Sequence, residues 1–193
     1  MEIIKDGKGR GYTVEVNEHN QIKAYSTVQS NLAYVSENHQ TAFMVYGKRD
    51  FVAANTDEAI LFMTYTGSNS LVADRITLTT NSSLAKVEMY VDSTRNSGGT
   101  LRVPLNLNRG SGITSETTVY VGISGSGGEL DITCNDDNEV FDLRLTSSGL
   151  PTYTFDFSGG LILEKNNTIC LVGEVDSIGD KIRANVYYYE EPS

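Results

Sequence analysis

The residues of this chain whose types could support chemistry are its two histidines, its two cysteines and a set of carboxylates. The histidines, His19 and His39, lie in polar stretches away from the cysteines and from any carboxylate cluster. A serine, histidine and aspartate triad also needs a nucleophile on a sharp turn before a helix, and no helix is evident in the pattern. We therefore expect both histidines to be exposed to solvent, and we predict no catalytic residue, no cofactor and no enzymatic activity.

Carboxylates are densest between Asp131 and Glu139, where Asp136 and Asp137 follow one another. Hard cations such as Ca²⁺ take roughly six to eight oxygen ligands, but this stretch lacks the glycine and the last glutamate of an EF-hand loop. A solvated turn between two strands is the favoured interpretation and a structural calcium site is the alternative, so we predict no metal site. Any acidic β protein also offers carboxylates that could pair for glycosidic cleavage, here Asp156, Glu174 and Asp176.

Cys134 and Cys170 each lie in or beside a β-patterned run. Free cysteines in such runs are usually buried and behave as small apolar residues, so we expect two buried, reduced thiols. A disulfide would need the two Cα atoms within about 7 Å, which the sequence alone does not decide. The spacing of a zinc site is absent.

The chain of 193 residues carries a formal net charge of −10, which argues against one large class of partners. Nucleic-acid binding depends mainly on lysine and arginine side chains that neutralise phosphates, so we predict no nucleic-acid partner. The first residues lack the apolar segment of a secretion signal, and no apolar run approaches the roughly 20 residues of a membrane span. We therefore expect a protein that is made in a cytosol and has no membrane partner.

The chain from residue 41 onward consists largely of short runs of alternating apolar and polar residues. These runs must position the cysteines and carboxylates described above. Such alternation places one set of side chains on a core and the other set outward. The run from Ala59 to Tyr65 is nearly continuous in apolar residues, which predicts a buried central strand. Pro104 limits the run from Leu101 to Leu107 to an edge strand or a crossing loop. The other runs that predict strands are 42–46, 74–80, 85–91, 117–123, 139–145, 153–157, 161–163, 168–172 and 181–189.

Roughly eight main strands at this spacing predict an all-β fold, an antiparallel β-sandwich of jelly-roll type over residues 41–193. Ser158 to Gly160 predicts a turn after the run 153–157. In the last strand, Tyr187, Tyr188 and Tyr189 place rings on both faces. We expect one set to fill the core and the other to pack on a neighbouring subunit; a carbohydrate platform is the alternative.

Residues 1–40 form a separate polar region, which we predict to be an extended N-terminal arm with a hairpin. Alternation in 12–16 and in 21–28 predicts two strands joined by a polar turn, and residues 31–40 fit either one or two helical turns or a loop. A lone hairpin is only marginally stable in water, so the arm is expected to lie on the sandwich or on another subunit. The arm residues predicted to bind a partner are Tyr12, Val14, Val16, Ile22 and Tyr25.

Two parts of the chain resemble small virion structural proteins of tailed bacteriophages, in which a polar arm precedes a jelly-roll-like domain. The first part is Gly11-Tyr12-Thr-Val-Glu-Val16-Asn17-Glu-His-Asn20-Gln-Ile22. The second is the closing pattern Phe157-Ser-Gly-Gly160-Leu-Ile-Leu163, Asn167-Thr-Ile-Cys-Leu-Val172 and Val186-Tyr-Tyr-Tyr189. The family offers no catalytic residues to carry over.

The resemblance implies a structural virion protein that decorates or cements a capsid through its arm and its sandwich, or an accessory of the head, neck, tail or fibre. Its partners would be the major capsid protein or other virion proteins, together with further copies of itself, a trimer being favoured. It would be located in the virion and assembled in the cytoplasm of the host bacterium. Two alternatives stay open: a tail- or fibre-associated carbohydrate-binding module, and a hydrolase on a jelly-roll scaffold.

Overall fold

The computed structural model divides the chain into two units, residues 1–30 and 31–193. In the second unit it describes residues 31–122, 129–146 and 152–191. In the first unit it describes four short strands: β1 (Ile3–Ile4), β2 (Tyr12–Thr13), β3 (Glu15–Val16) and β4 (Ile22–Lys23).

The first unit contains two antiparallel ladders. β3 pairs with β4, with Val16 opposite Ile22, which confirms the predicted hairpin for these residues, and β1 pairs with β2. Tyr12, Val16 and Ile22 lie in these strands, whereas Val14 and Tyr25 lie outside the described residues. The role of all five residues in binding a partner stays a prediction.

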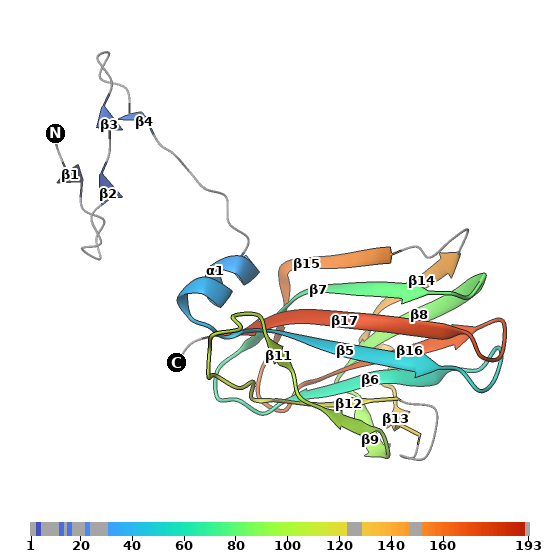
Figure 1. Ribbon diagram of the computed structural model, residues 1–193. Coiled ribbons are helices and arrows are strands. Elements are labelled where there is room, and N and C mark those ends of the chain that lie inside the picture. The colour runs from blue at the N-terminus through green and yellow to red at the C-terminus, as the bar shows by residue number, and fades with distance from the viewer. Residues whose placement is uncertain are drawn as a thin grey trace. The chain divides into compact units, whose positions relative to one another are not determined.

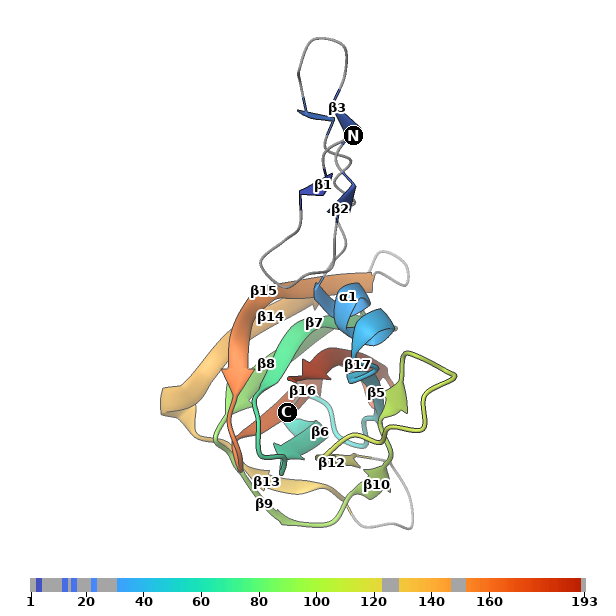
Figure 2. The same cartoon turned by 90° about the vertical axis from the view of Figure 1, so that its left-hand side faces the viewer.

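Two antiparallel sheets, packed face to face, make up most of the second unit (Figures 1 and 2). Sheet A has the order β11 (Leu105–Asn106), β5 (Ala42–Asp50), β17 (Lys181–Glu190), β7 (Leu71–Thr80) and β15 (Thr152–Leu163). Sheet B has the order β10 (Thr100–Arg102), β12 (Thr117–Val121), β6 (Glu58–Tyr65), β16 (Thr168–Val175), β8 (Leu84–Val91) and β14 (Glu139–Thr146). The predicted all-β, antiparallel sandwich is therefore confirmed.

The core between the sheets follows from the alternation of the strands. In β17, Ile182, Ala184, Val186 and Tyr188 are buried, while the residues between them are partly or fully exposed. β6 is buried at nearly every position and lies in the middle of sheet B, as its apolar run predicted. Burying one such aliphatic side chain stabilises the fold by about 1.5–3 kcal/mol, so this core is the main source of stability.

Two predicted boundaries differ from the structure. The runs 153–157 and 161–163 form one strand, β15, and the glycine segment between them is a shift of register against β7 rather than a turn. Such a bulge keeps both halves in one sheet while it bends the strand. The run from Leu101 to Leu107 was predicted to be an edge strand or a crossing loop, and it combines both. It forms β10 at the edge of sheet B, crosses to the other sheet, and forms β11 at the edge of sheet A.

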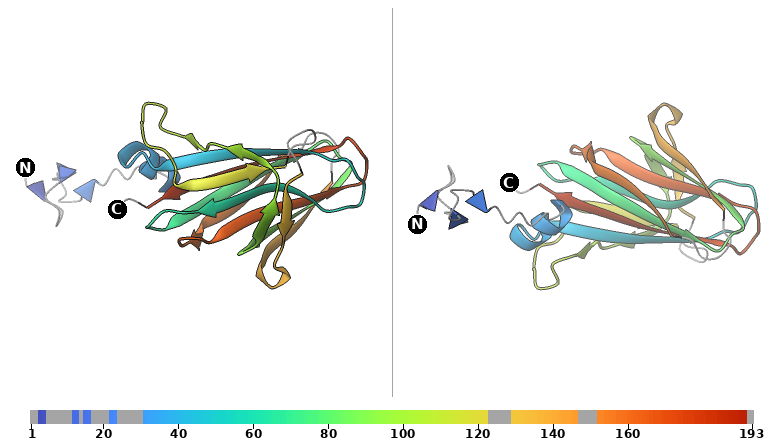
Figure 3. Two further views of the ribbon diagram at one scale, coloured as in Figure 1. Left: turned by 90° about the horizontal axis from the view of Figure 1, so that it is seen from below. Right: turned by 90° about the horizontal axis from the view of Figure 1, so that it is seen from above.

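Helix α1 (Asn31–Asn38) belongs to the second unit. Its Leu32 and Val35 are buried against Ala42, and Tyr187 and Tyr189 pack on the same cluster. The boundary between the N-terminal region and the sandwich domain was expected after residue 40, whereas the structure places it after Ser30. The outward tyrosines of β17 find an apolar partner in the chain's own helix, where the sequence had predicted a neighbouring subunit. Figure 3 shows α1 at the end of the sandwich where β17 ends.

Residues 92–138 connect β8 to β14, which are neighbours in sheet B. This long connection forms one lateral edge of the sandwich with β10, β11 and β12. It also forms a separate two-stranded ladder of β9 (Thr94–Ser97) and β13 (Asp131–Thr133). Among the described residues, no helix has both the length and the apolar character that a membrane crossing requires.

Candidate functional site

The outer face of sheet B carries a second apolar cluster, separate from the core. Phe62 of β6, Tyr90 of β8, and Cys170 and Val172 of β16 are buried there, although their neighbours along each strand point into the core. This arrangement follows from the strands themselves, because β6 and β16 are apolar on both faces. Water would otherwise contact these outer side chains, so the face needs a cover.

Residues 129–138, which we call the cover segment, provide it. Leu130 is buried in the outer cluster, and Ile132 and Cys134 pack against it. The segment then turns through a short 3₁₀ helix, η1 (Asp136–Asn138), capped by the Asn135 side chain, which accepts a hydrogen bond from the Asp137 N–H. Asp136 and Asp137 are exposed, so the predicted solvated turn between two strands is confirmed.

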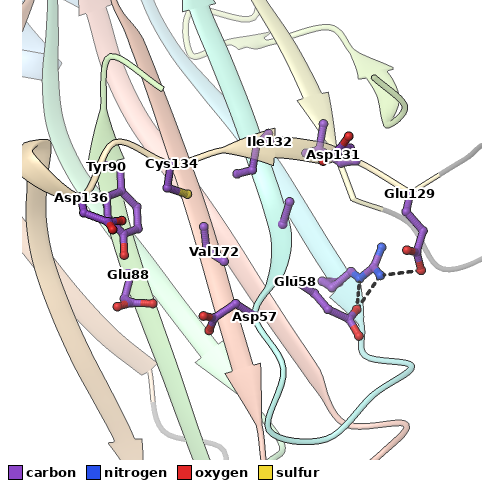
Figure 4. A pocket seen from close by; sticks show the side chains of 13 residues that line it. Asp57, Glu58, Glu88, Tyr90, Glu129, Asp131, Ile132, Cys134, Asp136 and Val172 are labelled. Atoms are coloured by element: carbon purple, nitrogen blue, oxygen red, sulfur yellow. Dashed lines mark hydrogen bonds and ion pairs between the residues drawn. The ribbon is translucent and has the colours of Figure 1, made fainter. Parts of the chain in front are cut away.

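A cleft of about 420 Å³ opens between the cover segment and the outer face of sheet B (Figure 4). Its floor is apolar and its rim is charged. The carboxylates that line it outnumber its single cationic lining residue, Arg49. The acidic lining residues are Asp57, Glu58, Glu88, Glu129, Asp131 and Asp136. The net charge of this cleft favours cationic ligands.

One end of the cleft is closed by a buried ion pair. The Arg49 side chain is 2% exposed, and its Nε and Nη2 both lie 2.5 Å from Oε2 of Glu58. Oε1 of Glu58 accepts hydrogen bonds from the backbone N–H groups of Val52 and Ala53, at 3.1 and 3.0 Å. Arg49 also contacts Glu129, at 3.2 Å. Both carboxylate oxygens of Glu58 and the Nε and Nη2 of Arg49 are partnered, so this pair fastens the turn after β5 to β6.

The other end of the cleft gathers Glu88, Tyr90 and Asp136, as Figure 4 shows. Oε1 of Glu88 lies 2.6 Å from Nζ of Lys86. Burial, and then the charge of Glu88, raises the pKa of the Tyr90 hydroxyl, which therefore stays protonated. Burial and the Glu88 charge also raise the pKa of Asp57. Burial is the larger cause of both shifts, and the contribution of Glu88 reflects the negative charge in the cleft.

Glu88 also belongs to a group of three carboxylates with Glu139 and Asp142, whose oxygen atoms lie within 4.8 Å of one another. The ladder of β8 with β14 brings them together, since it places Glu88 opposite Asp142. The sequence pattern did not reveal this group, because Glu88 is far in the chain from Glu139 and Asp142 and only the strand pairing brings them together.

The two cysteines meet at the floor of the cleft. Their Sγ atoms lie 3.8 Å apart, and Cys170 Sγ lies 3.3 Å from the hydroxyl of Ser93. Both are free thiols, as predicted, but only Cys170 is buried, whereas Cys134 is partly exposed and lines the cleft. The hydrogen bond between the sulfurs lowers the pKa of Cys170 and raises the pKa of Cys134. The proximity of the two sulfur atoms was not evident from the sequence pattern.

The remaining candidates from the sequence analysis do not converge. His39 is partly buried and packs edge-on against Tyr34, with 5.8 Å between ring centroids, so its predicted exposure is only partial; His19 lies outside the described residues. The Asp176 carboxylate accepts hydrogen bonds from Ser82 and Ser83, which lower its pKa. The Asp176 carboxylate therefore stabilises the turn between β7 and β8.

A second buried carboxylate, Glu190, is also fully partnered. It accepts hydrogen bonds from the hydroxyls of Ser115 and Thr117, at 2.5 and 3.0 Å, and from the N–H of Glu116. Burial raises its pKa despite these bonds. Glu190 thus holds the segment before β12 against the end of β17.

A shallow hollow of about 430 Å³ lies elsewhere on the outer face of sheet B. It is lined mainly by hydroxyl groups, with the ring of Tyr120 beside them, and the guanidinium of Arg95 lies 3.7 Å from the centroid of that ring. We call it the hydroxyl hollow. Its hydroxyl-bearing residues are Thr64, Thr66, Ser93, Thr94, Thr118, Tyr120 and Thr168.

The lateral edge formed by β10 and β11 presents exposed apolar side chains. Leu101, Val103 and Leu105 are 59%, 82% and 40% exposed, and Ile113 nearby in the chain is 43% exposed. The first three occupy every second position of the segment that passes from sheet B to sheet A. We call these four residues the apolar strip.

Comparisons of the chain with protein-family models, with curated proteins and with solved structures give no match. The functional assignment therefore depends on the surfaces described above.

Proposed function

We propose that this protein is a non-enzymatic structural component of a bacteriophage virion. In this proposal it decorates or cements the capsid, with the N-terminal unit and the sandwich both making contacts. The apolar strip is the observation that carries the proposal. Large exposed apolar groups that cluster on an otherwise charged surface are typical of interfaces, and an acidic chain of this kind is an unsuitable partner for nucleic acid.

The place of the apolar strip supports this role. It lies along β10 and β11, which are edge strands of the two sheets. An edge strand has backbone N–H and C=O groups that can pair with another chain. Pro104 removes one donor from the middle of the segment, so side-chain packing contributes more here than backbone pairing. Burying Val103 alone would stabilise a contact by about 1.5–3 kcal/mol.

The strand order supports the jelly-roll type. Numbered along the chain, the long strands β5, β6, β7, β8, β14, β15, β16 and β17 have the order 1-8-3-6 in sheet A and 2-7-4-5 in sheet B. Double sheets wound in this way are common in viral capsid proteins and in lectins. Because one fold serves many functions, this order agrees with the proposal without deciding it.

Binding to particles tests the proposal. Particles of the phage that encodes the chain, prepared without this protein, are mixed with the full-length protein, with residues 31–193 and with Val103→Asp. We expect the truncated protein to lose binding while it stays folded, and Val103→Asp to weaken binding by about tenfold or more. Ile178→Asp is the matched control, because Ile178 is 72% exposed on a distant turn. Equal cosedimentation of all four proteins would contradict the proposal.

A second candidate function is the binding of a glycan in the hydroxyl hollow. Sugars are bound by hydroxyl and amide groups beside an aromatic ring, and Tyr120 lies among five threonines there. A glycan array probed with the full-length protein tests this. We expect Tyr120→Ala to lose any signal and Tyr46→Ala, at an exposed tyrosine of β5 outside the hollow, to keep it. Absence of binding, or equal loss in both variants, would exclude this candidate.

A further inference from the structure

We propose that Cys134 and Cys170 form an oxidisable thiol pair that reacts with small disulfides, cationic ones in preference, and closes an intramolecular disulfide. This modification site is separate from the proposed virion function and does not depend on it. The product would link the cover segment covalently to the outer face of sheet B.

The geometry places the two sulfurs in contact, from elements that are distant in the sequence. Cys170 lies in the middle of β16, and Cys134 lies between β13 and η1, a separation of 36 positions. Their Sγ atoms are 3.8 Å apart, and a disulfide needs about 2.05 Å. Cys134 can make this approach because it lies outside the strands, beside the exposed residues Asn135 and Asp136.

The cleft gives the two thiols different access. Cys134 is partly exposed and lines the cleft, whereas Cys170 is fully buried beneath it. An oxidant that enters the cleft therefore meets Cys134 first, and Cys170 is positioned to resolve the mixed disulfide. This order distinguishes the pair from two independent surface thiols.

The reaction balances as two thiol–disulfide exchanges. Cys134 loses its proton to water and attacks one sulfur of the oxidant, the S–S bond of the oxidant breaks, and one small thiolate leaves. Cys170 then gives up a proton, attacks Cys134 sulfur and releases the second small thiolate. The two cysteines lose two electrons to the oxidant, and their two protons end on the released thiols. The lowered pKa of Cys170 favours its thiolate, which is the nucleophile of the second exchange.

The charge of the cleft selects among oxidants. Six carboxylates and one arginine line it, so a cationic disulfide such as cystamine is attracted and the anionic oxidised glutathione is repelled. We expect cystamine to react about tenfold faster at low salt, and the ratio to approach one as salt screens the carboxylates. A ratio of one at all salt concentrations would show that oxidants do not enter through the charged cleft.

The decisive experiment treats the reduced full-length protein with cystamine and follows intact mass, free thiols and the melting temperature. We expect both thiols to disappear, the mass to fall by about 2 Da, and peptide mapping to find Cys134 linked to Cys170. The melting temperature should rise by about 10 °C, because the disulfide closes a loop and so lowers the conformational entropy of the unfolded chain. Retention of both thiols, or a product linked only between molecules, would overturn the proposal.

Two variants test the order of attack. Cys134→Ser should neither lose mass nor take up cystamine, because the remaining thiol is buried. Cys170→Ala should instead keep one cysteamine in a mixed disulfide with Cys134, since no second thiol resolves it. The melting temperature of this variant in the reduced state shows that it is folded. The proposal is wrong if Cys134→Ser reacts as fast as the wild type, or if a cysteamine adduct persists on the wild-type protein.

Discussion

The two faces of sheet B are closed by different means. On the inner face, residues such as Leu61, Ile169 and Leu171 pack against sheet A in a predominantly apolar layer. On the outer face, Phe62 and Cys170 from the same strands lie under the short cover segment, beside an acidic cleft. A strand that is apolar on both sides needs two covers. In this chain the second cover is small and open, and the potentially reactive groups lie beneath it.

The difference extends to the forces involved. Apolar burial alone accounts for the inner core, whereas the outer region is fastened by paired charges at the closed end of the cleft. A buried ion pair adds little net stability over an apolar pair of the same size, yet breaking it leaves one buried charge without compensation. The outer region should therefore be sensitive to the loss of single charges, and the inner core to the loss of volume.

Arg49→Met should have the largest effect. It leaves the Glu58 carboxylate buried without its cation, so we expect a loss of about 4 kcal/mol in the free energy of unfolding, measured by urea denaturation. Lys48→Met is the matched control, because Lys48 pairs with Asp50 at 2.9 Å on the surface, and we expect a change of about 0.5 kcal/mol. Similar losses in both variants would mean that the buried pair does not fasten this region.

A pair of leucine variants compares the two clusters directly. Leu78 is fully buried in the core and Leu130 is buried in the outer cluster. We expect Leu78→Ala to cost about 3 kcal/mol and Leu130→Ala about 1.5 kcal/mol, because the cover segment can collapse into the space that is left. The same denaturation measurement gives both values. Equal costs would show that the cover is packed as rigidly as the core.

The sequence was sufficient for the parts of this structure that depend on local pattern. Alternation predicted the strands and the sandwich, and the apolar run of β6 predicted a buried central strand. A proline correctly marked the segment where the chain passes from one sheet to the other. Each of these features depends on residues within a few positions of one another.

The candidate site could not be predicted in the same way, because strand pairing across long separations creates it. Cys134 meets Cys170 only after β16 pairs with β8 and the cover segment folds over both. Glu88 meets Asp142 through the ladder of β8 with β14. The outward tyrosines of β17 illustrate the same limit, since a polar stretch with few apolar residues supplied their helical partner.

Asp57→Asn should have the smallest effect, and its pH dependence makes it informative about the cleft. Burial and the charge of Glu88 raise the pKa of Asp57 above its ordinary value. The folded state therefore binds this proton more tightly than the unfolded chain, and the ionised carboxylate lowers stability as pH rises from the unfolded pKa through the folded pKa.

Removing this charge should stabilise the protein at neutral pH by about 0.5 kcal/mol or less, because Asp57 is partly exposed to screening solvent. The gain should vanish below the unfolded pKa, where both states are protonated, and it should shrink as salt is added. Melting temperatures of the variant and the wild type between acid and neutral pH measure it. A gain that persists at acid pH would have its origin in packing and not in the potential of the cleft, and the preference for cationic disulfides would lose its electrostatic basis.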